Sequence, residues 1–155
     1  MASPSKAERP ATYDDANLLL RLYELRREEK LRQAREWFMK NFHARTIKEF
    51  QKVCPMGSQE NAYARMVWSY WDMAASLVTT GAIDADAFRA AHGEIFATFS
   101  KVQPYLGQLR SAAGEPDFCK HTEAVVMAAP DAEEILKRRR EAIRAAAKAR
   151  AEKSR

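Results

Sequence analysis

A single charged residue, Asp72, lies in the aromatic stretch VWSYWDMAASLV, which spans residues 67–78. A carboxyl group there has three interpretations: a general acid with a raised pKa, an exposed residue at the edge of the apolar face, or a structural carboxylate paired with a basic side chain. Because burial of an unpaired charge is costly, pairing is favoured, and Asp72 is predicted to form a structural ion pair between two helices. The preceding helical segment offers Arg21, Arg26, Arg27, Arg32 and Arg35.

Other residue types that carry chemistry show no recognisable spacing. There is no Glu-x-x-His motif of a di-iron bundle, no Gly-x-Ser-x-Gly elbow and no glycine-rich phosphate loop. Cys119 and His121 are two residues apart, which turns them to different sides of a helix. A pairing of Cys54 with a histidine stays open on residue types alone, and His92 is expected to be a hydrogen-bonded structural residue. The sequence therefore predicts no catalytic residue, no metal and no cofactor, and a protein that is not an enzyme.

Positive charge is concentrated at the C-terminus. Residues 137–155 carry nine Lys or Arg and two Glu, a net charge of +7, whereas residues 1–136 have a net charge of −2. Such a segment is either a solvated helix that aids solubility or a cationic arm for phosphates or an acidic protein surface. It lacks the aromatic residues that stack on bases and the large apolar residues of a membrane anchor. The candidate polyanion-binding residues are Lys137, Arg138, Arg139, Arg140, Arg144, Lys148 and Arg150.

The chain has 155 residues, of which 46% are hydrophobic and 30% charged, as expected for one soluble helix-rich domain. It has no apolar run of about 18 residues, so no membrane span is predicted. The first residues lack the apolar core of a secretory signal, and the two cysteines are not in CxxC spacing, so a reduced, cytoplasmic protein is expected. We expect a disordered arm (1–11), a helical bundle domain (12–130) and a basic, alanine-rich helical tail (131–155).

The first half of the chain contains several helix-start signals. Thr12 precedes two acidic residues and predicts the cap of a helix that runs without Pro or Gly to about Phe42. The sequence TIKE at 46–49 is a capping box and opens a short helix. Ser58 caps the next helix, which carries the aromatic stretch and ends where Gly81 suits a left-handed turn.

The second half continues the helical pattern. Asp84 caps a helix whose apolar stripe reaches Val102, and Pro104 forces a break or a fresh first turn. A shorter helix ends at Gly114, and another, over 115–129, closes before Pro130. No segment alternates with a period of two. The predicted fold is all-α: an irregular bundle of about five helices, with a long first helix and a protruding basic C-terminal helix.

Three stretches resemble one known family. They are LYELRREEKLRQAREWFMKNF at 22–42, LVTTGAID at the end of the aromatic-rich helix, and FSKVQPYLGQLR after it. In their order they resemble a bacterial all-helical domain family catalogued only as a domain of unknown function, over about residues 13–128. The resemblance implies a small helical domain and supplies no activity and no catalytic residues. The basic tail lies outside it.

Two functions follow as hypotheses. The first is a non-enzymatic helical adaptor or interaction protein, which binds a protein partner or itself and whose cationic tail attracts a polyanionic or acidic partner. The second is a nucleic-acid-associated protein that binds sequence-independently through the tail. Removal of the tail should weaken salt-sensitive binding in both cases, and only the second requires RNA or DNA.

Overall fold

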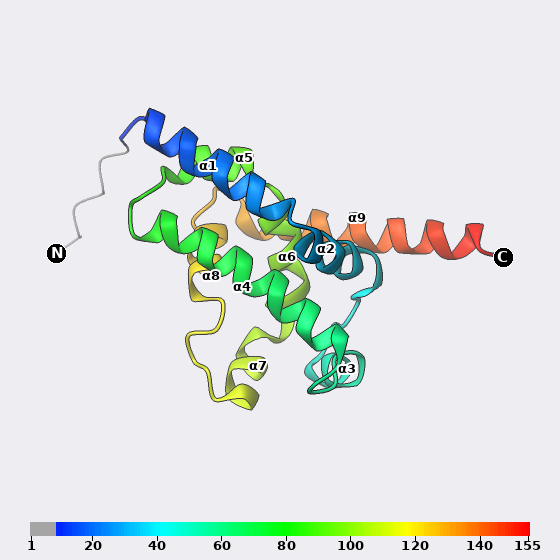
Figure 1. The fold of residues 1–155 in the computed structure, drawn as a ribbon. Coiled ribbons are helices and arrows are strands. Elements are labelled where there is room, and N and C mark those ends of the chain that lie inside the picture. The colour runs from blue at the N-terminus through cyan, green and yellow to red at the C-terminus, as the bar shows by residue number, and fades with distance from the viewer. Residues whose placement is uncertain (1–8) are drawn as a thin grey trace.

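The computed structural model describes residues 9–155, and all regular elements within that range are helices. They pack into an irregular bundle, with α4 across the middle and α9 extending beyond the other elements (Figure 1). No helix of residues 9–155 is long and apolar enough to cross a membrane. The disordered arm predicted for residues 1–11 falls mostly outside the described residues. Within them, Arg9 donates to the Asp15 carboxylate, with a closest N–O distance of 2.6 Å.

The prediction of one helix over 12–42 is wrong, because α1 (Tyr13–Arg26) and α2 (Glu29–Asn41) are separate. Thr12 caps α1 as expected and forms a reciprocal capping box with Asp15. The chain then turns at Arg27, and the Glu28 carboxylate accepts hydrogen bonds from the amides of Lys30 and Leu31. Glu28 thus acts as a second cap and satisfies the first amides of α2. Because a new helix can start there, α1 ends at Arg26 although no proline or glycine follows it.

The caps of the next two helices follow the sequence signals. In α3 (Ile47–Val53), the Thr46 hydroxyl accepts from the Glu49 amide, whereas the Glu49 carboxylate accepts from the amide of Arg45 and not of Thr46 itself. In α4 (Gln59–Thr79), Ser58 accepts from the third helical amide, 3.1 Å away. Gly81 follows α4 with φ +88°, a conformation that glycine adopts without strain.

The apolar stripe predicted from Asp84 to Val102 is divided between two helices, α5 (Ala85–Ala91) and α6 (Glu94–Val102). Asp84 caps α5 as predicted, through the Ala87 amide. The break falls at His92, whose side chain is buried between the rings of Trp71 and Phe88, at centroid distances of 5.9 and 5.2 Å. The bundle therefore contains more and shorter helices than the expected count of about five.

A 3-10 turn, η1 (Gln103–Tyr105), contains Pro104 and leads into α7 (Leu106–Ala113). Gly114 ends α7 with φ +67°, as expected. The following helix, α8 (Lys120–Met127), begins later than the predicted 115, because Cys119 itself adopts a left-handed conformation, with φ +57°. A non-glycine residue in this region is uncommon, so the sequence gives no signal for this start.

The last helix, α9 (Ala132–Lys153), packs its first turns against α6 and α8. Leu136 is fully buried there, at 0% exposure. Its inward side continues with the half-buried residues Arg140, Ile143 and Ala147, and all residues beyond 147 are exposed. The segment 131–155 was predicted to be a tail throughout, but the first turns of α9 contribute to the core, and only the last turns project (Figure 1).

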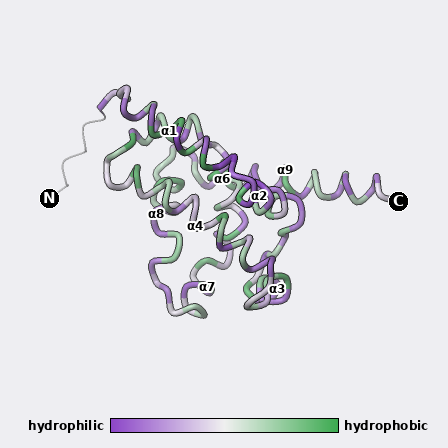
Figure 2. The backbone as a smooth tube through the Cα atoms, viewed as in Figure 1, coloured by the Kyte–Doolittle hydropathy of each residue, from purple (hydrophilic) through white to green (hydrophobic). Residues whose placement is uncertain are grey.

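The core is centred on α4, which packs against α2 and α8. Trp71 is fully buried, and Trp68 lies edge-on against Phe38 and Phe42 of the α2 end. Hydrophobic positions recur along α4, whereas hydrophilic residues alternate with alanines along α9 (Figure 2). The aromatic residues of α4 are therefore mainly core, and Trp68 packs on the end of α2, beside which the site described below is formed.

Candidate functional site

The ion pair predicted for Asp72 is replaced by a different interaction. Its Oδ1 atom accepts hydrogen bonds from the amide and the hydroxyl of Thr122, at 2.9 and 3.1 Å. No arginine within residues 9–155 forms a salt bridge with it. Because Thr122 lies in the first turn of α8, Asp72 caps the N-terminus of that helix from α4, where a negative charge is favourable.

The basic residues of the first helices have other acidic partners. Arg35 of α2 forms a bidentate pair with Glu94 of α6, with N–O distances of 2.8 and 2.5 Å, and Arg26 lies 3.8 Å from the same carboxylate. These two arginines, which the sequence offered as partners of Asp72 on α4, are thus paired with Glu94 on α6. Asp72 itself borders a shallow pocket with Trp68 and His121.

The remaining candidates for chemistry lie apart from one another. Cys54 and Cys119 are buried free thiols, and burial raises the pKa of Cys54 to about 11, so this thiol is protonated at neutral pH. Neither cysteine hydrogen-bonds to a histidine within residues 9–155. His92 is buried, and neither of its ring nitrogens has a well-aligned hydrogen-bond partner among residues 9–155. No group of three or more His, Cys, Asp or Glu side chains in the same range could hold a metal ion.

The predicted polyanion-binding residues of α9 separate into two groups. Arg140 and Arg144 line a pocket of about 590 Å³ between α9 and the body. Arg140 is held in place, because it donates to the Ser100 carbonyl at 3.2 Å and to Gln103 Oε1 at 2.9 Å. Lys137, Arg138, Arg139, Lys148 and Arg150 do not line it and are exposed, and Arg144 is exposed as well.

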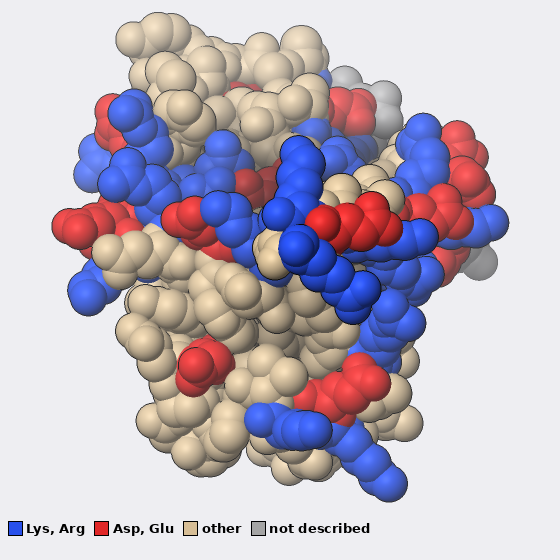
Figure 3. Space-filling model, turned by 90° about the vertical axis from the view of Figure 1, so that its right-hand side faces the viewer, with Lys and Arg blue, Asp and Glu red and all other residues tan. Residues whose placement is uncertain are grey.

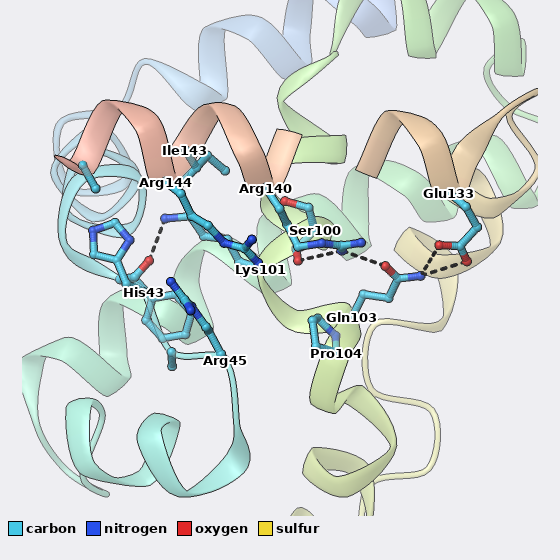
Figure 4. A pocket seen from close by; sticks show the side chains of 13 residues that line it. His43, Arg45, Ser100, Lys101, Gln103, Pro104, Glu133, Arg140, Ile143 and Arg144 are labelled. Atoms are coloured by element: carbon cyan, nitrogen blue, oxygen red, sulfur yellow. Dashed lines mark hydrogen bonds between the residues drawn. The ribbon is translucent and has the colours of Figure 1, made fainter. Parts of the chain in front are cut away.

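Three segments that are distant in sequence build this pocket. The loop from Phe42 to Arg45 forms one wall, the end of α6 with Pro104 forms the floor, and α9 forms the opposite wall. Figure 4 shows Lys101, Arg45 and Arg144 extending toward the same space. The apolar portion of the lining includes Ile143 and Ala147 of α9. The pocket thus combines several cations with an apolar strip.

Lys101 is the residue of this site that the sequence analysis missed. Lys101 is only 7% exposed, and its ammonium group donates to the carbonyls of Phe38, Met39 and Phe42, at 2.6, 3.1 and 2.7 Å. It therefore caps the C-terminal end of α2, where orphan carbonyls and the helix dipole favour a cation. Burial, with the charge of Arg150, lowers the pKa of Lys101 to about 7.

The cations around the pocket act on each other. Burial lowers the pKa of His43, and the charges of Lys101, Arg150 and Arg45 lower it further. The only acidic residue of the lining, Glu133, accepts a hydrogen bond from Gln103 at 3.2 Å. Figure 3 looks onto the face from which α9 projects and shows Lys and Arg side chains gathered around its centre, with acidic residues between them. The site can therefore attract an anion.

The comparisons with known proteins identify a family and name no activity. No curated protein and no solved structure is significantly similar to the chain. One family profile, described as "Domain of unknown function (DUF4760)", matches residues 11–128. This range agrees with the resemblance drawn over about residues 13–128, and α9 lies beyond it. Since the match covers most of the 155 residues, the chain belongs to the DUF4760 family.

Proposed function

We propose that the protein is a non-enzymatic helical interaction protein, and that its basic helix α9 attracts an acidic or otherwise polyanionic partner. The observation that supports this most is the lack of acidic partners for the α9 cations. Within residues 9–155, none of the Lys or Arg side chains of α9 forms a salt bridge, and Arg140 donates only to neutral oxygens. Unneutralised cations on a projecting helix create a positive field that steers anionic partners toward it.

The proposal is tested by removing charge from the last turns of α9. A triple variant, Lys148→Gln, Arg150→Gln and Lys153→Gln, removes three exposed cations and keeps a good helix former at each position. Binding of a fluorescent poly-glutamate peptide at low salt should weaken roughly tenfold, since exposed ion pairs contribute about 0.2–1 kcal/mol each.

A matched control separates the effect of α9 from that of net charge. The variant Arg21→Gln, Lys30→Gln and Lys52→Gln also removes three exposed cations, but from α1, α2 and α3. When the variants are compared at about 0.1–0.15 M salt, it should bind the peptide within about twofold of the wild type, because screening there limits the reach of a charge to roughly 8–10 Å. Equal weakening in both triple variants would show that only net charge matters, and the assignment to α9 would be wrong.

A second candidate function is sequence-independent binding of nucleic acid, which the density of cations in residues 137–155 favours. Labelled RNA and duplex DNA in the same assay distinguish the two. For a nucleic-acid-binding protein, affinity should fall linearly on a log–log plot against salt, with a slope of about −0.7 to −0.9 per phosphate contacted. Tighter binding of RNA or DNA than of the acidic peptide at equal salt would favour this second function.

A further inference from the structure

The pocket at the base of α9 holds two arginines whose hydrogen-bonding capacity is free. Lys101 uses its donors on three carbonyl groups, and Arg140 is held by Ser100 and Gln103. By contrast, the guanidinium groups of Arg45 and Arg144 have no hydrogen-bonding or ionic partner within residues 9–155, although they come from opposite walls of the same pocket. Two such groups can bind carboxylates with two parallel hydrogen bonds each.

The same pocket offers an apolar surface between these cations. Ile143 and Ala147 are half-buried on the inward side of α9, and Pro104 faces them from the floor. A phosphate backbone would leave this strip uncovered. Phe42 is fully buried, so the ring of the lining on which a base could stack is the single exposed imidazole of His43. The chemistry that fits both features is an acidic chain segment that also carries an apolar side chain.

We infer that this pocket is the docking site for an acidic peptide segment of a protein partner, with carboxylates on Arg45 and Arg144 and an apolar side chain against Ile143 and Ala147. This inference rests on the proposed function, because the projecting turns of α9 would attract the segment that the pocket then holds. The exposed turns supply long-range, salt-sensitive attraction. The pocket supplies selectivity, since a segment must match the guanidinium groups on its two walls and the apolar strip between them at the same time.

The first test compares two charge reversals in the full chain. Arg45→Glu changes a cation of the pocket, and Lys48→Glu makes the same charge change at an exposed position of α3 outside it. The probe is a fluorescein-labelled peptide of Glu residues interspersed with Leu. Arg45→Glu should weaken its binding at least tenfold, and Lys48→Glu less than twofold. Circular dichroism verifies folding, and Arg144→Gln replaces Arg45→Glu if that variant does not fold.

The second test concerns the apolar contact. Ile143→Ser removes apolar surface without changing charge. It should weaken binding of the Glu/Leu peptide about fivefold and leave a Glu/Ser peptide of equal charge unchanged. Equal effects on the two peptides would show that the apolar contact in the inference is wrong. If RNA displaces the Glu/Leu peptide, and Arg45→Glu weakens the binding of that RNA, the pocket binds nucleic acid and the assignment to an acidic peptide is wrong.

The failure of this inference differs from the failure of the proposed function. If the α9 triple variant weakens peptide binding while Arg45→Glu and Lys48→Glu have equal effects, the partner is attracted by α9 but does not enter the pocket. If the wild-type chain binds neither peptide at low salt, both proposals are wrong.

Discussion

Substitution of Asp72 tests whether its role is that of an acceptor or of a paired charge. Asp72→Ala removes the acceptor of both Thr122 hydrogen bonds and leaves the start of α8 without its cap. Asp72→Asn keeps an oxygen at the Oδ1 position and loses only the charge. The structure therefore predicts that alanine is more harmful than asparagine.

The magnitudes follow from the geometry. Loss of a helix cap costs about 0.5–2 kcal/mol, and the lost hydroxyl bond adds up to about 1 kcal/mol, reduced because Asp72 is only half-buried. We expect a loss of about 1–2 kcal/mol for Asp72→Ala. For Asp72→Asn, only the interaction of a negative charge with the helix N-terminus is lost, which contributes about 0.3–1 kcal/mol.

Urea unfolding followed by circular dichroism measures these differences as shifts of the midpoint at constant slope. Glu24→Ala is a suitable control, because that exposed side chain makes no hydrogen bond within residues 9–155. Thr122→Val should not add its full cost to Asp72→Ala, since the two side chains interact directly. If Asp72→Asn destabilises as much as Asp72→Ala, the charge and not the acceptor is essential, and the capping role is refuted.

Three further predictions follow from burial and charge. Lys101 has a pKa of about 7 in the folded protein, below its unfolded value of about 10.4. Between these two pKa values the unfolded chain binds more protons than the folded one, so the free energy of unfolding should rise as the pH increases above 7. The free energy of unfolding of the wild type relative to Lys101→Met should increase by up to about 1.4 kcal/mol per pH unit between pH 7 and 8.5. If this difference between the two proteins does not change with pH, the three carbonyls keep the ammonium group charged and the lowered pKa is wrong. Trp71→Ala should cost about 3–5 kcal/mol, because this ring is fully buried, whereas Met73→Ala, at a site 42% exposed on the same helix, should cost far less by thermal unfolding. Leu136→Ala should cost about 2–5 kcal/mol, while deletion of residues 148–155 should change stability by less than about 0.5 kcal/mol. If Leu136→Ala costs as little as the deletion, the first turns of α9 do not belong to the core.

The predictions that succeeded rest on local chemistry. The caps at Thr12, Ser58 and Asp84 were found because a side-chain acceptor satisfies amides only three residues away. Gly81 and Gly114 were found because a positive φ favours glycine. Each of these signals involves only a few neighbouring residues, so it does not depend on the tertiary packing of the rest of the chain.

The predictions that failed depend on tertiary packing. The break at Arg27 and the start of α8 after Cys119 involve residues without a strong local preference for ending or starting a helix. The pocket unites Arg45, Lys101 and Arg144, which lie more than forty residues apart in sequence, so composition reveals only the wall that α9 contributes. Asp72 was predicted to pair with an arginine, and its partner Thr122 on α8 was not foreseen, since arginines are the more obvious partners of a carboxylate.

The division of α9 has a consequence for how its sequence can change over evolution. Leu136 is held by the core, and Arg140 by two hydrogen bonds, so few substitutions are tolerated there. Beyond Ala147 every side chain is exposed, and only helix propensity limits the choice of residue. Cations in those turns can move along the helix, change between Lys and Arg, or be lost with little effect on the packing of the core, although the charge of Arg150 also lowers the pKa of Lys101. The projecting end can therefore adapt to a new partner by single substitutions, while the bundle that holds it stays the same.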